Sequence, residues 1–259
     1  MADEQLKIYD VWDRPTRWFH WINVLTVLGL IGLGLVILNG SALGVSAQGK
    51  ILLKVTHVWV GYVFVANLVV RLIWGFLGNR YTRWGGILPG GFGYFSSVRD
   101  YAVSFFGKRP KRYLGHNPIG RISVAIMLLL LAVQAITGLV LAGTDIFYPP
   151  FGSWIAQWIA ADGVDPASLV PSAKEMYDQQ AYQDMRAFRS PFITTHLYAF
   201  YALIVVVVVH TAAVIITEIR EGGTLVSAMF TGRKIIAGTP VDRAESNVPK
   251  GGDSAESEL

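Results

Sequence analysis

Four apolar stretches, each long enough to cross a lipid bilayer, limit the folds open to this chain. They cover residues 18–38, 55–78, 122–143 and 192–217. A hydrocarbon core of about 30 Å takes about 20 helical residues, and a helix satisfies its own backbone hydrogen bonds there. Hydrophobic residues make up 53% of the chain, which is too apolar for an ordinary soluble domain. The sequence therefore predicts an all-α integral membrane protein folded as a four-transmembrane-helix bundle.

Basic residues are spread unevenly over the connecting segments. Segments 1–17, 79–121 and the part after 217 carry sixteen Lys and Arg residues, whereas 39–54 and 144–191 carry five. Cytoplasmic loops carry the excess of positive charge. Both termini are therefore expected in the cytoplasm, and segments 39–54 and 144–191 are expected outside. The net charge of +4 is explained by these loops, and no nucleic-acid partner is expected.

Four of the five histidines lie within the apolar stretches: His20, His57, His196 and His210. The last two are fourteen residues apart, which is roughly 21 Å along a helix and close to four whole turns, so both rings share one side. The expected topology places His57 and His196 at the outer depth, and His20 and His210 at the inner depth. Each pair could supply two axial nitrogens to one haem iron, a six-coordinate arrangement that suits electron transfer.

The chain has no cysteine. This excludes disulfides, Cys-ligated iron–sulfur clusters and covalently attached c-type haem, so haem would be held by histidine alone. A haem-free membrane transporter or proton channel using the same histidines is the alternative. A passive anchor would explain the spans but not the spacing of the histidines. The fifth histidine, His116, lies in the polar segment GHNPIG and is expected to be a solvated loop residue.

Arg71 follows His57 by fourteen residues, so it lies on the same helix face at the inner depth. A cation within a span needs a partner. A propionate of an inner haem would provide one, and snorkelling to the headgroups is the alternative. In the segment 152–160, Trp154 and Trp158 suggest a short helix, either on the membrane surface or packed within the loop.

Three motifs resemble the prokaryotic cytochrome b561 and nickel–iron hydrogenase cytochrome b superfamily. They are VWDRPTRWFHW at 11–21, HVWVGYVFVANLVVRLIWGFLGNRYTRW at 57–84 and LVSAMFTGRK at 225–234. The resemblance covers about residues 8–236. It implies a di-haem cytochrome b transmembrane domain over 1–236, with two haem b groups held between the helices. The family's iron ligands fall on His20, His57, His196 and His210. The polar residues 237–259 are expected to form a disordered cytoplasmic tail.

The resemblance also implies a role as the electron-transfer subunit of a membrane oxidoreductase complex in the bacterial inner (cytoplasmic) membrane. Electrons would pass between a periplasmic redox partner and quinone. The outer loop 144–191 is longer than expected for a hydrogenase cytochrome b, so the partner is either hydrogenase-like or a c-type cytochrome. Quinone is expected near the inner haem, with Arg14, Arg17 and Trp18 as candidates for its pocket. The alternative is that these three residues only anchor the first helix to headgroups.

Overall fold

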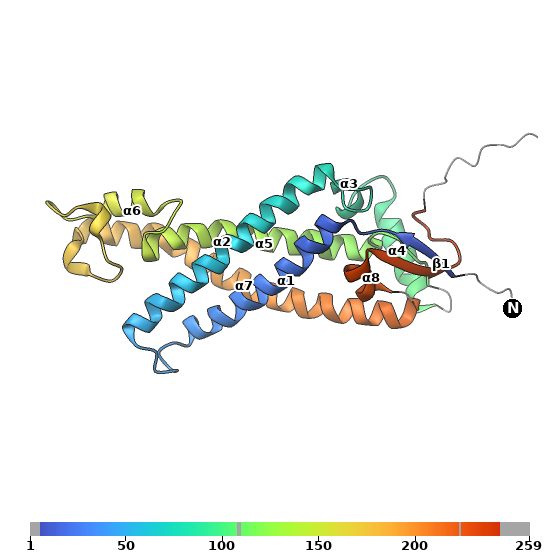
Figure 1. The fold of residues 1–259 in the computed structure, drawn as a ribbon, viewed down its shortest axis with the longest axis horizontal. Coiled ribbons are helices and arrows are strands. Elements are labelled where there is room, and N and C mark those ends of the chain that lie inside the picture. The colour runs from blue at the N-terminus through green and yellow to red at the C-terminus, as the bar shows by residue number, and fades with distance from the viewer. Residues whose placement is uncertain (1–5, 108–109, 223, 244–259) are drawn as a thin grey trace, which may run out of the picture.

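The computed structural model describes residues 6–107, 110–222 and 224–243, and the part of the expected tail beyond Arg243 lies outside them. Four long helices, α1 (Arg14–Leu38), α2 (Ala47–Leu77), α5 (Pro118–Ile146) and α7 (Gln179–Glu221), dominate the fold. They run lengthwise through the molecule (Figure 1). Each is long and apolar enough to cross a membrane, so the four predicted spans are confirmed.

Polar N-cap residues set where the four long helices begin. Each helix begins before the first residue of its apolar stretch. In each case a side-chain oxygen accepts a hydrogen bond from a backbone N–H three residues on, which satisfies one of the free donors of the first turn. The caps are Asp13, Ser46, Asn117 and Asp178. The largest difference is in α7, which begins thirteen residues before the predicted span and continues through Pro191.

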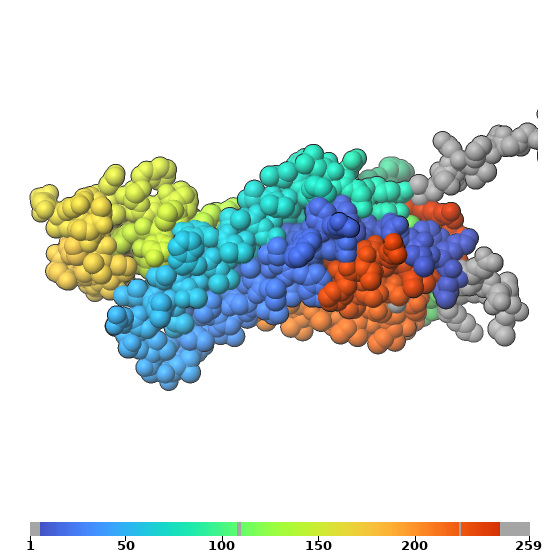
Figure 2. Space-filling model, viewed as in Figure 1, coloured from blue at the N-terminus to red at the C-terminus, as the bar shows by residue number. Residues whose placement is uncertain are grey.

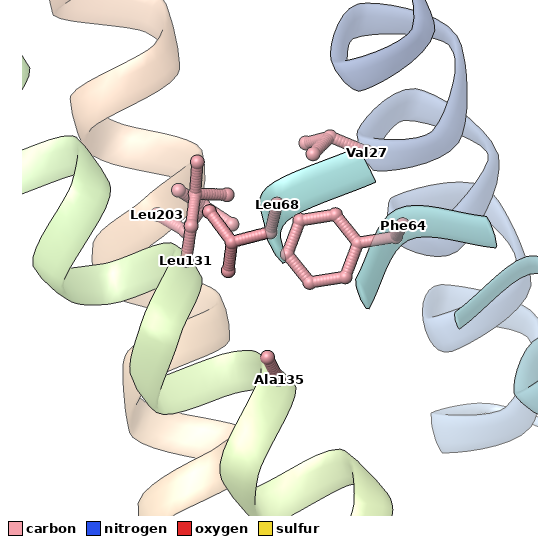
Figure 3. Close-up of a cluster of buried hydrophobic side chains, with 6 residues drawn as sticks. All are labelled: Val27, Phe64, Leu68, Leu131, Ala135 and Leu203. Carbon is pink, nitrogen blue, oxygen red and sulfur yellow. The ribbon is translucent and has the colours of Figure 1, made fainter. Parts of the chain in front are cut away.

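The bundle is held by apolar packing at its middle. Helix α1 packs along α2, α5 packs along α7, and α2 joins the two pairs by contacting α5. The side chains that meet at the centre come from all four helices (Figure 3): Val27, Phe64, Leu68, Leu131, Ala135 and Leu203. Phe64 follows His57 by seven residues and Leu203 follows His196 by seven, so this central cluster lies between the two histidine depths.

Both termini of the described chain lie at one end of the bundle, called here the termini end (Figure 1). There β1 (Leu6–Asp10) pairs antiparallel with β2 (Arg233–Ala237). The short helices α3 (Trp84–Ile87), α4 (Tyr94–Phe106) and α8 (Leu225–Thr231) surround this ribbon. Residues 237–243, expected in the tail, are held in place, because the Asp242 carboxylate accepts hydrogen bonds from the backbone N–H groups of Leu114 and Gly115 at 2.7 Å.

A separate lobe forms the opposite, distal end (Figure 2). It contains α6 (Gly152–Ile159), the 3-10 turns Pro166–Ser168 and Lys174–Met176, and the start of α7. Buried residues of α6, including Ile155 and Ile159, pack with Met185 of α7. One face of helix α6 is therefore packed within the loop. Trp154 and Trp158, the residues that suggested a helix on the membrane surface, are 66% and 42% exposed.

Candidate functional site

His57 and His196 face each other near the distal end, where α2 begins and α7 crosses it. Their ring centres are 6.4 Å apart, and the rings are inclined at 69°. A ring nitrogen binds a metal at about 2 Å and lies about 1 Å from the centre of its ring, so two imidazoles on one metal ion have centres about 6 Å apart. At the observed spacing, both rings could therefore bind one shared metal ion.

An apolar cavity lies beside these two rings. All four long helices contribute to its lining, and the space is partly open to the surroundings. A Cβ built on Gly61 meets nothing within 4 Å, and one built on Gly138 lies 3.4 Å from Cε1 of His196. Both glycines line the cavity, so side chains at these positions would occupy space that a flat group next to the histidines needs.

Two polar residues of α5 support His196 and were missed in the sequence. The Thr137 hydroxyl oxygen lies 2.8 Å from Nδ1 of His196, and Nε2 of Gln134 donates to the His196 carbonyl at 3.0 Å. The signal was present, because these two residues are three apart, on one face of an otherwise apolar span. They fix both the ring and the backbone of His196 against α5.

His20 and His210 form the second level, near the termini end. Nδ1 of His20 is buried without a hydrogen-bond partner among the described residues. The levels are fourteen residues apart on α7, roughly 21 Å of helix rise. The structure thus brings His57 and His196 together, and it carries His20 on α1 and His210 on α7.

Arg71 is buried beside the second level, with 5% of its surface exposed. One guanidinium nitrogen donates to the Thr82 carbonyl at 3.1 Å, and the group lies over the rings of Phe19 and Trp84. Its Nη1 is buried and has no partner among the described residues. The side chain therefore does not snorkel to solvent. Its free N–H group could donate a hydrogen bond to a carboxylate such as a haem propionate.

His116 is not the solvated loop residue expected from the sequence. Its ring centre lies 5.1 Å from that of Trp12, and its Nδ1 is buried. Burial, together with the nearby positive charge of Lys234, lowers the pKa of His116 to about 3. Burial also lowers the pKa of Lys234 to about 8. Segments distant in sequence fold over this loop, so its polar composition did not reveal the burial.

The three quinone candidates take different positions at the start of α1. Arg14 is exposed and Trp18 is 68% exposed. Arg17 instead points to α8, where it donates to the Phe230 carbonyl, while its Nε is buried without a partner among the described residues. Trp18 and Arg14 are thus open to the surroundings, and Arg17 links α1 to α8.

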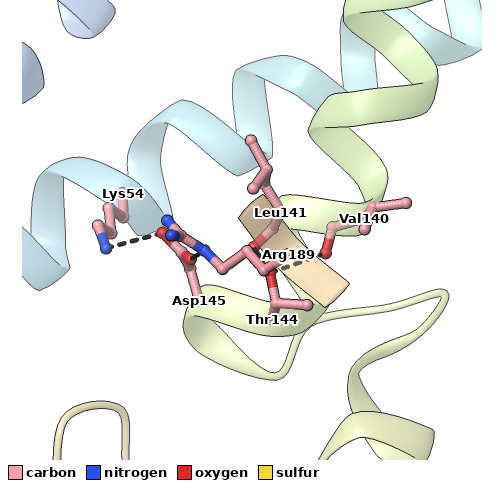
Figure 4. Close-up of polar contacts among 6 residues, drawn as sticks. All are labelled: Lys54, Val140, Leu141, Thr144, Asp145 and Arg189. Atoms are coloured by element: carbon pink, nitrogen blue, oxygen red, sulfur yellow. Dashed lines mark hydrogen bonds and ion pairs between the residues drawn. The ribbon is translucent and has the colours of Figure 1, made fainter. Parts of the chain in front are cut away.

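Asp145 joins three helices at the distal end (Figure 4). Its carboxylate accepts from Lys54 Nζ at 2.8 Å and from Arg189 Nε at 2.5 Å. Lys54 lies three residues before His57, and Arg189 seven before His196. The ion pairs therefore fix α2 and α7 to α5 close to the distal histidine pair.

Comparison with known proteins identifies the family of this chain. The profile of a family described as "Prokaryotic cytochrome b561" matches residues 11–232. The chain belongs to this family. It is 27% identical to a protein of Rhizobium leguminosarum bv. viciae named "Probable Ni/Fe-hydrogenase B-type cytochrome subunit", over 90% of this chain and 91% of the relative.

Other relatives carry similar names. A "Probable Ni/Fe-hydrogenase B-type cytochrome subunit" of Cupriavidus necator is 24% identical over 89% of this chain and 88% of its own length. A "Probable Ni/Fe-hydrogenase 1 B-type cytochrome subunit" of Escherichia coli K12 is 33% identical over 51% of this chain and 59% of its own length. No solved structure matches the chain.

Family membership implies b-type haem between the helices of a multi-pass membrane electron carrier. The residues at the distal level fit such a group. They provide facing imidazoles at the required spacing, an apolar cavity, and glycines where side chains would obstruct it. Near the termini end, the unpartnered Nη1 of Arg71 could donate a hydrogen bond to a carboxylate of such a group.

Proposed function

We propose that this chain holds two b-type haems, each with two histidine ligands, and carries electrons between a periplasmic redox partner and quinone. His57 and His196 bind the distal haem, and His20 and His210 bind the haem near the termini end. The observation that carries the proposal is the 6.4 Å spacing of the His57 and His196 rings beside an apolar cavity. His210 lies fourteen residues further along α7 than His196, which supports a second site on the same side of this helix.

The distal end faces the periplasm of a bacterial inner membrane, and both termini lie in the cytoplasm. The support is the charge asymmetry, sixteen Lys and Arg residues in the termini-end segments against five in the distal ones. Both ends of the described chain lie at the same end of the bundle, as this orientation requires.

The periplasmic partner docks on the distal lobe and is either a hydrogenase-like oxidoreductase or a c-type cytochrome. Relatives named as hydrogenase cytochrome subunits support the first class. The segment 144–191 carries six acidic and three basic residues, a balance that attracts a basic surface. This lobe lies beside the distal histidine pair, so a partner there is closer to that pair than to the other.

Quinone is handled near His20 and His210, with Arg14, Arg17 and Trp18 as candidates for the pocket. A lipid-soluble carrier arrives laterally, and the exposed Trp18 lies at the start of α1 where such a carrier first meets the bundle. The unpartnered Nε of Arg17 offers a donor to a quinone oxygen.

Bound haem iron supplies one-electron oxidation and reduction. The chain's own residues position that chemistry. The four span histidines would hold the iron of the two haems through their imidazole nitrogens, a ligand set that suits electron transfer rather than oxygen binding. Arg71 offers a buried cation to a propionate, and the central cluster places apolar side chains between the two levels.

Haem counting tests the proposal. The purified protein should give two haems per chain in a pyridine haemochrome assay, and none would be found in a haem-free transporter. His57→Ala and His196→Ala should each remove the same spectral component, and His20→Ala and His210→Ala the other. His116→Gln is the control and should keep both components. Loss of one component in both His20→Ala and His196→Ala would contradict the pairing.

Labelling and turnover test orientation and the quinone end. A Ser168→Cys variant places a thiol on an exposed loop residue of the distal lobe. It should react with a membrane-impermeant reagent in whole cells, and labelling only after lysis would reverse the topology. His210→Ala should stop quinone-linked turnover while the distal haem still exchanges electrons with its partner. Full quinone turnover in that variant would place the quinone site at the distal end.

A further inference from the structure

Thr137 contacts a ligand histidine from a buried position on α5. Only 5% of the residue is exposed. Its hydroxyl oxygen lies 2.6 Å from the Val133 carbonyl oxygen, 2.8 Å from Nδ1 of His196 and 3.4 Å from the Gln134 carbonyl oxygen. The two shortest contacts determine where the protons lie.

The shorter contact joins two oxygen atoms, and a carbonyl oxygen has no proton to give. At 2.6 Å the hydroxyl proton must therefore lie between them, so Thr137 donates to Val133. The hydroxyl oxygen is then left as an acceptor toward His196. Nδ1 of His196 must carry the proton of this second hydrogen bond, and Nε2 keeps its lone pair.

This tautomer is the one that binds iron through Nε2. A metal-binding histidine commonly donates its other N–H to an oxygen acceptor, which fixes the ring and makes the ligand nitrogen more basic. Across the cavity, Nδ1 of His57 is buried without a partner among the described residues. The two ligands of the distal level therefore differ, and only His196 has an acceptor of this kind on the described part of the chain.

We propose that Thr137 is a positioning residue that holds His196 in the Nδ1–H tautomer and lowers the reduction potential of the distal haem. The inference rests on the proposed function, because it assumes haem between His57 and His196. A more basic axial ligand stabilises the oxidised iron, and hydrogen bonding around the site is one of the ways a protein tunes potential. Gln134 holds the His196 backbone at the same level, so removal of the hydroxyl leaves that second link intact.

Thr137→Val removes the acceptor while keeping the shape of the side chain. Thr144→Val is the matched control, because Thr144 lies on the same helix, is also 5% exposed and donates to the Val140 carbonyl at 3.2 Å (Figure 4). Thr137→Ser restores the hydroxyl. Each variant is purified with its haem, and the two haems are titrated potentiometrically with their spectra recorded.

Thr137→Val should keep two haems and shift only the distal potential upward, while Thr137→Ser and Thr144→Val match the parent protein. Loss of the distal haem in Thr137→Val with retention in Thr137→Ser would also support the proposal. An unchanged distal potential in Thr137→Val, an equal shift of both haems, or failure of Thr137→Ser to restore the parent value would overturn it. If His57→Ala and His196→Ala both keep the full haem content, the proposed function itself fails instead.

Discussion

Gly61→Leu is expected to weaken haem binding at the distal level and leave the other level intact. Gly61 lines the cavity beside His57 and His196, and a Cβ built on it meets nothing within 4 Å, so the leucine would extend into that space. Overpacking an interior costs about 1–3 kcal/mol. Since about 1.4 kcal/mol is a tenfold change, haem affinity should fall roughly 5- to 150-fold.

Gly32→Leu is the matched control. Gly32 is an exposed residue of α1 and is not among the described residues that line the cavity. Both substitutions replace a helix glycine and gain about 0.5–1 kcal/mol of helix propensity, so their difference reports the cavity alone. Haem is titrated into the haem-depleted variants in detergent, and bound haem per chain is counted. Equal affinity and content in the two variants would refute the reasoning.

Three further outcomes concern stability. Asp145→Asn should lower the free energy of unfolding by about 0.5–2 kcal/mol, because it removes two ion pairs. Asp100→Asn, which removes the exposed ion pair with Lys111, should change it little. Equal shifts of the melting temperature in the two variants would contradict this. The pKa of His116 is lowered to about 3, so stability should fall as pH drops below its ordinary value of about 6.5, and His116→Leu should remove this loss. The pKa of Lys234 is lowered to about 8, so stability should rise from about pH 8 toward pH 10.5, and Lys234→Met should abolish the rise. Thermal unfolding across pH checks both, and a slope unchanged by the substitution would count against the corresponding group.

The membrane helices and the histidine levels could be predicted because both depend on local periodicity. About twenty consecutive apolar residues form a helix in lipid, because a helix satisfies its own backbone hydrogen bonds. A spacing of fourteen residues places His196 and His210 on the same helix face and sets the distance between them along the axis. The helix starts were less accessible, because they depend on single capping residues. Asp178 begins α7 well before the apolar run, and the helix tolerates Pro191, which normally marks a boundary.

Features built from distant segments could not be predicted. His116 is covered by Trp12 and by Lys234, each more than one hundred residues away in the chain. The pairing of β1 with β2 joins residues more than two hundred positions apart. The Thr137 contact lies between these cases, since its place in the span is visible in the sequence but its partner on α7 is not.

The central cluster also affects how the protein responds to a membrane potential. It places apolar side chains between the two histidine levels. An electron passing between haems at these levels would move its charge over roughly 21 Å of a hydrocarbon core of about 30 Å. A full crossing costs or yields about 2.3 kcal/mol per 100 mV, so this step corresponds to about 1.6 kcal/mol. The direction of electron flow in an energised membrane would then depend on the voltage as well as on the haem potentials.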